Sequence, residues 1–379
     1  MIERVNALVP VLRSRARETE QLKHMHPDNL EALTQAGVFK LTMPKSHGGY
    51  EASPREINEV LAQIARGCPS TSWICGIISA SNLWPALLCD EAADEILATP
   101  DLRITGLIAP TGKVVQVDGG VRISGTFLWN TGGVHSRYMW LAGMLSTDEG
   151  TYPIACLVPA DEVEISQTWD ASGMSGTATN KVVAKDVFIP EKHTIPVSAL
   201  TTGQFPKRQF SGNPYYNRPM IQMFLVISAG TILGIARGAM DVYMEKLPSR
   251  AITYTTYSKA GEAALTHHQV ATAQLHLDTA ELMTRALEDL LMNSWDKEVS
   301  LDDRIKTRAW LGHIARNAKT CVNILFEASG GSAIQHAADI QRYFRDANSL
   351  NLHALVQPTS SDEVYGRHLC GLEPNTTLL

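Results

Sequence analysis

The chain has 379 residues, of which 44% are hydrophobic, and a formal net charge of −6. A chain of this length and composition can bury a large core and is expected to contain about two or three packed units. Its negative charge argues against a nucleic-acid partner, because such a partner is usually bound through a basic surface. The six cysteines are scattered without a Cys-x-x-Cys pair. The sequence therefore predicts reduced thiols, with neither a metal site nor a disulfide framework.

Residues 1–102 are predicted to form a helical domain, because apolar residues recur there at helical spacing. One helix is expected to be capped by Asp28. A later one is expected to begin after Ser53, with Glu56 at the spacing of a capping box. The charged N-terminal stretch lacks an apolar segment followed by a small-residue cleavage site. We therefore expect no export signal and a cytoplasmic protein.

Residues 103–205 are predicted to form a small β-domain. Short runs of β-branched and aromatic residues alternate there with Gly, Asn and Asp, a pattern typical of strands joined by tight turns. The Asp118-Gly119-Gly120 sequence is one expected turn.

Residues 206–379 return to helical periodicity and are predicted to form a second helical domain. Their most apolar segment, residues 224–240, is interrupted by Arg237 and is shorter than the roughly 20 residues of a membrane span. We expect it to be a buried core helix, and we expect no membrane association.

Four segments resemble one known family. Residues 41–50 (LTMPKSHGGY) place a proline and two glycines before a helix, and residues 124–133 (SGTFLWNTGG) end a strand with Trp, Thr and paired glycines. Residues 173–180 (GMSGTATN) precede a strand that ends in Asp-Val-Phe-Ile-Pro, and residues 326–347 contain Gly-Gly and Arg-Asp-Ala. Together with the order of helices, strands and helices, they resemble the acyl-CoA dehydrogenase superfamily. The resemblance implies a mostly helical α+β fold, with an N-terminal helical domain, a β-barrel-like middle domain and a C-terminal four-helix bundle.

The resemblance also implies where a flavin ring binds. Trp129 and Thr131 match the two residues that contact the ring in this family, and Gly132 follows them. Residues two apart on a strand point to the same side. We therefore expect the indole and the hydroxyl to meet one face of the flavin.

Other matched residues concern the cofactor phosphates. Arg250 matches an arginine that binds the phosphates of a neighbouring subunit's flavin, a task that suits its forked guanidinium. Gly330 and Gly331 match a turn through which the backbone approaches the cofactor closely. Glu327 replaces a phosphate-binding glutamine, and its negative charge would repel phosphate. Reduced FMN and reduced FAD therefore both remain candidates.

The loop after Arg-Asp-Ala distinguishes two reactions. Many acyl-CoA dehydrogenases carry their catalytic carboxylate eight residues after this Asp; counted from Asp346, that position is Ala354, and residues 349–360 include no acid. The neighbouring His353 resembles instead a histidine of the two-component flavin monooxygenases that share the fold. An imidazole with a pKa of ~6.5 can accept a phenol or indole proton, or stabilise a flavin C4a-(hydro)peroxide. We predict His353 and Thr131 as catalytic residues.

The expected reaction is hydroxylation of a phenol- or indole-type small molecule. It would use O2 and reduced flavin supplied by a separate NAD(P)H:flavin reductase, in a homotetramer like the relatives. Trp73 and Trp84 are predicted substrate contacts, with core packing as the alternative for Trp84, and His135 is a second histidine expected near the flavin. The alternatives are desaturation of an acyl thioester by an acid among residues 245–262, N-oxygenation of an amine such as an amino sugar, and non-enzymatic flavin binding.

Overall fold

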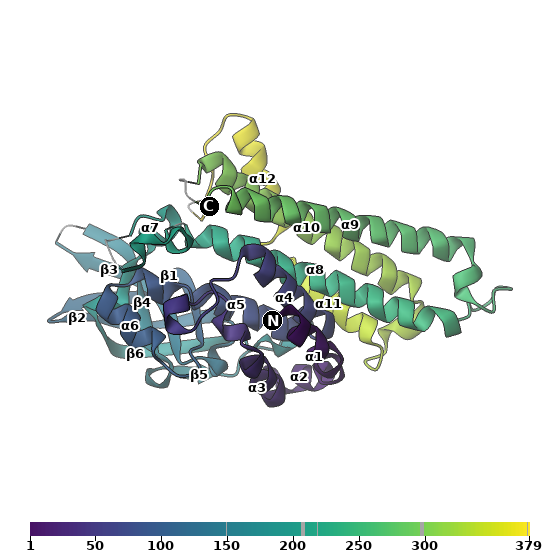
Figure 1. Cartoon of the computed structure of the whole chain (residues 1–379), viewed down its shortest axis with the longest axis horizontal. Coiled ribbons are helices and arrows are strands. Elements are labelled where there is room, and N and C mark those ends of the chain that lie inside the picture. The colour runs from purple at the N-terminus through teal and green to yellow at the C-terminus, as the bar shows by residue number, and fades with distance from the viewer. Residues whose placement is uncertain (149, 206–208, 218, 296–298, 377) are drawn as a thin grey trace.

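Helices, a β-sheet and a second set of helices follow one another along the chain (Figure 1). The computed structural model describes residues 1–379 except 149, 206–208, 218, 296–298 and 377. The sheet and the N-terminal helices lie side by side, and the long helices α8, α9 and α10 cross the molecule and extend beyond them.

The N-terminal helices begin where local sequence signals allow. The predicted capping box is confirmed, because the Glu56 N–H donates to Ser53 Oγ at 3.3 Å and the Ser53 N–H donates to the Glu56 carboxylate at 2.8 Å. The predicted Asp28 cap is wrong. That helix starts at Pro27, which needs no donor in the first turn, and His26 Nδ1 accepts the Asp28 N–H at 3.2 Å. The elements are α1 (Ile2–Ser14), α2 (Ala16–Leu22), α3 (Pro27–Ala36), α4 (Pro54–Gly67), α5 (Pro69–Ser81), the 3-10 turn η3 (Trp84–Leu87) and α6 (Asp90–Leu97).

The middle of the chain forms a seven-stranded sheet in the order β5-β6-β2-β1-β3-β4-β7. The expected turn between β1 and β2 is present, and Gly119 adopts a φ of 75° in it. Side chains alternate across β3: Met139 and Leu141 join the core of the sheet, whereas Trp140 and Ala142 join the core of the helices. The sheet therefore packs one face against the helical regions. The strands are β1 (Ile104–Val117), β2 (Gly120–Asn130), β3 (Tyr138–Thr147), β4 (Gly150–Pro159), β5 (Glu164–Ser166), β6 (Asn180–Pro190) and β7 (Thr194–Pro196).

The helix α8 is the central element of the C-terminal region. It is long and apolar enough to cross a membrane, but 83% of its most apolar stretch is buried inside the protein. Gly230 and Gly234 let it approach α4 closely, because a Cβ on either would lie within 2.4 Å of an α4 carbonyl oxygen. The prediction of a buried core helix is confirmed. The C-terminal helices are α7 (Val197–Thr202), α8 (Met220–Lys246), α9 (Ala264–Met292), α10 (Leu301–Ala328), α11 (Asp339–Leu350) and α12 (Pro358–Leu369).

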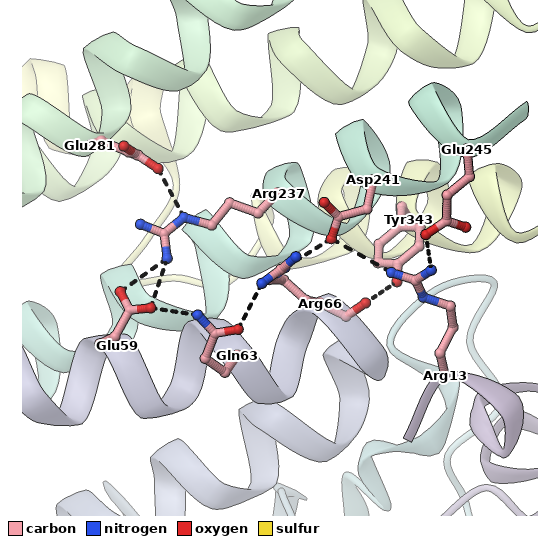
Figure 2. A network of polar contacts seen from close by, with 9 residues as sticks. All are labelled: Arg13, Glu59, Gln63, Arg66, Arg237, Asp241, Glu245, Glu281 and Tyr343. Atoms are coloured by element: carbon pink, nitrogen blue, oxygen red, sulfur yellow. Dashed lines mark hydrogen bonds and ion pairs between the residues drawn. The ribbon is translucent and has the colours of Figure 1, made fainter. Parts of the chain in front are cut away.

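A network of ion pairs joins the N-terminal helices to the C-terminal bundle (Figure 2). Arg237 of α8 bridges Glu59 of α4 at 3.0 Å and Glu281 of α9 at 2.8 Å. Arg66 of α4 pairs with Asp241 of α8 at 2.8 Å. These partly buried pairs hold α4, α8 and α9 in register, because each guanidinium is shared between two helices or more.

Candidate active site

A cavity of about 780 Å³ lies where the sheet meets the helices. Its wall is formed by α5, part of β1, the end of β2, the loop before β6, the start of α8 and the loop between α11 and α12. Five aromatic side chains dominate it, namely Trp73, Trp84, Trp129, Trp169 and Phe224. This size and apolar lining suit a flat aromatic ring system together with a small substrate.

Irregular backbone shapes the sheet side of the cavity. The pairing of β1 with β3 shifts register between Leu107 and Gly112, and β2 shifts against β6 near its end, where Trp129 has a left-handed φ of 67°. Met174 and Ala178, in the loop before β6, also have positive φ values of 52° and 48°. Such conformations cost about 1–3 kcal/mol each in non-glycine residues and cluster at functional sites.

His353 is held in the cavity wall by its own loop. Its Nδ1 accepts the Leu355 N–H at 3.3 Å, and its ring meets Trp73 edge-on at 5.2 Å and Phe224 at 6.1 Å. Burial lowers the pKa of His353 to about 4, so the imidazole is neutral near pH 7. Because Nδ1 accepts a hydrogen bond from the backbone, the single ring proton lies on Nε2. His353 therefore presents an N–H donor.

No carboxylate lines the cavity among the residues that the structure describes. Ala354, at the sequence position of the dehydrogenase base, is in the wall. Asp346 of the Arg-Asp-Ala motif lies behind the wall and accepts the Met174 N–H at 2.5 Å. Burial raises the pKa of Asp346 to about 7. Asp346 therefore fixes the loop that carries Met174.

Arg308 of α10 joins two segments of the cavity wall. Its Nη1 donates to the Leu378 carbonyl at 3.1 Å and its Nη2 donates to the Ala354 carbonyl at 3.3 Å. The side chain is buried, and desolvation lowers the pKa of Arg308. Burying a charge is costly unless hydrogen bonds compensate for the lost hydration, and these two carbonyls supply such bonds. The His353 loop and Leu378 are thus fixed together.

The predicted flavin-ring residues lie together on the sheet side. Thr131 lines the cavity just after β2, and its hydroxyl lies 3.0 Å from that of Thr179, which lies 2.7 Å from that of Thr177. Trp129 is 64% exposed and meets Trp169 edge-on at 5.5 Å. The simple strand alternation expected for Trp129 and Thr131 does not apply, because β2 ends at Asn130. The bulge, rather than the pleat, directs both into the cavity.

The two tryptophans predicted to contact substrate and the second histidine predicted near the flavin lie in different places. Trp73 and Trp84 both line the cavity, and Trp84 also packs against Trp140 with its ring centroid 5.3 Å away. His135 is outside the lining, and its ring packs edge-on against His24 at 5.6 Å. Burial, followed by the nearby His24, lowers the pKa of His135 to about 4.

Four of the predicted cofactor residues lie outside the cavity lining. Gly132, which follows the ring-binding Thr131, has a φ of 71° and packs against α5. The residues predicted to bind the phosphates lie farther away. Arg250 follows the far end of α8 and lies beside Gly330, and Gly331 is in the same turn. Because α8 contains 27 residues, Arg250 is roughly 40 Å from the helix end that lines the cavity. Within one chain, Arg250 is therefore too far away to bind the phosphate of a flavin whose ring lies in this cavity.

Several lining residues were not predicted from the sequence. Trp169, Thr177, Thr179, Phe224 and Leu378 all line the cavity. Thr177 and Thr179 belong to the small-residue segment 173–180, whose resemblance to the family indicates the fold and not the chemistry. The others come from parts of the chain that only tertiary packing brings to this wall.

The cavity fits the ring of a flavin better than its phosphate. Aromatic walls and a group of threonine hydroxyls match an isoalloxazine, which is flat, apolar on its faces and polar along one edge. Among the described residues, no Lys or Arg lines the cavity. A bound flavin would therefore need positive charge from outside this wall for its phosphate.

Comparisons with known proteins cover the whole chain. Residues 7–89 match the family described as acyl-CoA dehydrogenase, N-terminal domain, and residues 226–358 match acyl-CoA dehydrogenase, C-terminal domain. The chain is 30% identical to the pigment production hydroxylase of Rhodococcus sp. (strain ATCC 21145), over 100% of this chain and 98% of that protein. It is 29% identical to HsaA, the oxygenase subunit of a flavin-dependent monooxygenase of Rhodococcus jostii (strain RHA1), over 100% of both.

Solved structures agree with these sequence matches. XiaF from Streptomyces sp., in complex with FADH2 and glycerol, superposes with a TM-score of 0.89 and 27% identity. The match covers 99% of this chain and 96% of XiaF.

Proposed function

We propose a function from the premise that this chain belongs to the acyl-CoA dehydrogenase family, in its branch of oxygenase components of two-component flavin-dependent monooxygenases. The chain is accordingly an oxygenase that uses reduced flavin, and a flavin reductase is its partner. When bound, reduced flavin supplies the two electrons with which dioxygen is split, so that one oxygen atom enters the substrate and the other leaves as water.

The composition of the cavity wall supports hydroxylation over desaturation. Desaturation requires a carboxylate that removes a proton next to the acyl carbonyl. Among the described residues, His353 is the one titratable side chain of the wall, and Ala354 holds the position of that base. The acidic residues 245–262, the alternative source, lie at the α8 end that is remote from the cavity.

The hydrogen-bond direction of His353 refines the substrate class. Its Nε2–H is a donor, so it favours a substrate that presents an acceptor oxygen, such as a phenol or phenolate. For His353 to take the phenol proton as a base, Nδ1 would have to give up the Leu355 N–H. We therefore assign His353 the task of orienting and stabilising the substrate oxygen. An indole, which offers an N–H donor, fits this group less well.

The aromatic walls support a planar substrate. Trp73 and Phe224 flank His353 at ring-centroid distances of 5.2 Å and 6.1 Å, and edge-to-face contacts of this kind stabilise a further aromatic ring. An amino sugar would need several hydroxyl-binding groups, and this wall is mainly apolar. The cavity therefore favours aromatic hydroxylation over N-oxygenation.

The cofactor site is proposed to be shared between subunits of a homotetramer. Trp129 and Thr131 would contact the ring of reduced FMN or FAD, and Arg250, with Gly330 and Gly331, would serve the phosphate of a neighbouring subunit's flavin. Two observations support this arrangement: Arg250 is remote from its own cavity, and α9 exposes Leu275 and Leu282, each 65% accessible and seven residues apart on one helix face. Light scattering of the purified chain tests the oligomeric state.

The cytoplasm is the proposed location. All six cysteines are free thiols in the structure, and a cytoplasmic setting keeps thiols reduced. A cytoplasmic flavin reductase and NAD(P)H would be available there.

The test is a coupled reaction with labelled oxygen. The purified chain is mixed with a flavin reductase, NADH and FMN or FAD under 18O2, and a panel of phenols, indoles and amines is analysed by mass spectrometry. We expect a phenol to gain one 18O atom only when the chain is present. Bleaching of bound oxidised flavin by an acyl-CoA, without reductase or oxygen, would instead establish desaturation.

A further inference from the structure

Three threonine hydroxyls form a continuous chain between the cavity and a buried carbonyl. Thr177 Oγ1 donates to the Met174 carbonyl at 2.8 Å. The Thr177 and Thr179 hydroxyls lie 2.7 Å apart, and those of Thr179 and Thr131 lie 3.0 Å apart. All three threonines line the cavity, and Thr177 is the most buried of them. The Thr131 hydroxyl, at one end of the chain, is therefore connected through two hydroxyls to a backbone carbonyl at the other end.

The inner end of this chain sets its direction. A carbonyl oxygen can only accept, and each hydroxyl has a single hydrogen. Because Thr177 gives its hydrogen to Met174, Thr179 must donate to Thr177. Thr131 must then donate to Thr179. Thr131 has then used its hydrogen, so toward the cavity it can only accept a hydrogen bond through a lone pair.

The carbonyl that sets this direction is itself fixed. The Met174 carbonyl also accepts Trp169 Nε1–H at 2.9 Å, and the Met174 N–H donates to Asp346 at 2.5 Å. Thr177 lines the cavity but is only 1% exposed, so its hydroxyl keeps the Met174 carbonyl as its partner. The chain of donors cannot reverse without breaking a buried hydrogen bond.

We propose that Thr177 and Thr179 are positioning residues that make Thr131 a hydrogen-bond acceptor and thereby favour reduced over oxidised flavin in this cavity. The inference rests on the proposed function. A reduced isoalloxazine carries a hydrogen on N5, whereas the oxidised ring has a bare lone pair there. With N5 of a bound ring against Thr131, the reduced ring would let Thr131 keep its bond to Thr179 and gain a second one. The oxidised ring would let Thr131 bond N5 only by giving up Thr179.

The difference amounts to one neutral hydrogen bond. Such a bond changes an equilibrium by about fivefold. The Thr179→Val variant frees the Thr131 hydrogen, so each form of the ring can make one bond. In the Thr177→Val variant, the Thr179 hydroxyl loses its acceptor and can donate to Thr131 instead. Thr131 can then donate to N5 and still keep Thr179 as a partner. Both variants should remove the preference, for different reasons.

The experiment measures two dissociation constants for each protein. FMN binding is titrated aerobically for the oxidised form, and anaerobically after dithionite reduction for the reduced form. The ratio of the oxidised to the reduced constant should fall about fivefold in Thr177→Val and Thr179→Val relative to the native chain. Thr177→Ser and Thr179→Ser, which retain the hydroxyls, are the matched controls and should keep the native ratio.

The ratio separates positioning from a structural role. Damage to the site would weaken both flavin forms together and leave the ratio unchanged, and that result in the valine variants would overturn the proposal. Thr179 is only partly buried, so Thr179→Val provides the test if Thr177→Val does not fold. A native chain that binds neither form would overturn the proposed function itself, which is a different outcome from an unchanged ratio.

Discussion

Replacing His353 by asparagine should reduce the sensitivity of the fold to acid. The pKa of the native imidazole is about 4, against an ordinary value of 6.5, and the cause is burial. Between these values the unfolded chain binds more protons than the native one, so stability is lost as the pH falls from 6.5 towards 4. The full effect is about 3.4 kcal/mol, at about 1.36 kcal/mol per pKa unit.

The expected difference can be worked out for accessible conditions. Between pH 7 and pH 5, the unfolded chain becomes protonated at His353 while the native chain stays neutral there, and this should lower the free energy of unfolding by about 2 kcal/mol. This is an upper figure, because the ring is partly open to the cavity. For a chain of 379 residues, that free energy corresponds to about 2–3 °C in Tm. Asparagine does not titrate, and its side-chain oxygen can accept the Leu355 N–H in place of Nδ1. His353→Asn should therefore lose less Tm between pH 7 and pH 5 than the native chain does.

Two other titrating groups, Asp346 and His135, also change the stability of the fold over this pH range. Asp346 acts in the opposite sense: its native pKa is raised to about 7, so the native state binds the extra proton and stability increases as the pH falls from 7 towards 4. His135 acts in the same sense as His353, because its pKa is also lowered to about 4. His135→Asn is the matched variant outside the cavity, and it should reduce acid sensitivity without changing substrate binding. Melting curves are recorded at pH 7, 6 and 5; parallel pH dependence for the native chain and His353→Asn would refute the reasoning.

Three other substitutions test contacts that hold the cavity wall or join the helices. Arg308→Met removes the bonds to two carbonyls of the cavity wall and should raise the KM for substrate about tenfold while changing the flavin Kd little, as steady-state kinetics and flavin titration can show. Asp346→Leu leaves the buried Met174 N–H without an acceptor and should destabilise the protein by about 1–3 kcal/mol, measured by urea unfolding at pH 7.5. Arg237→Met should destabilise by about 1–3 kcal/mol, because Glu59 and Glu281 lose a shared partner; in a double-mutant cycle, the loss should shrink when Glu281→Gln is already present.

Local sequence signals predicted the fold because the two hydrophobic periods are local properties. The order of helical and strand regions follows from spacings of about 3.6 and 2, and the capping box at Ser53 needs only three neighbouring positions. The Asp28 cap failed because Pro27 suits the first helical position, so the helix begins one residue before Asp28 and the cap position falls on His26. An error of two residues at a helix end is typical of such local competition.

The site was less predictable, because it depends on contacts between distant segments. Trp129 and Thr131 were found from a motif, but the bulge that directs them depends on how β2 pairs with β6. Thr177 and Thr179 lie in segment 173–180, which resembles the family, yet their proposed role depends on distances to Met174 and Thr131. The position of Arg250 relative to the cavity follows from the length of α8 and from its packing, and neither can be read from the motif alone.

Two polar groups of the cavity are fixed in opposite hydrogen-bond directions, and backbone groups fix both. The Leu355 N–H makes His353 a donor through Nε2, and the Met174 carbonyl makes Thr131 an acceptor through two intervening hydroxyls. A backbone N–H cannot accept and a carbonyl cannot donate, so neither direction can be exchanged by rotating a side chain. The cavity is thus prepared for one ligand that offers a hydrogen and another that offers a lone pair. Reduced flavin at Thr131 and a phenolic oxygen at His353 satisfy both requirements at once, whereas oxidised flavin with an indole satisfies neither.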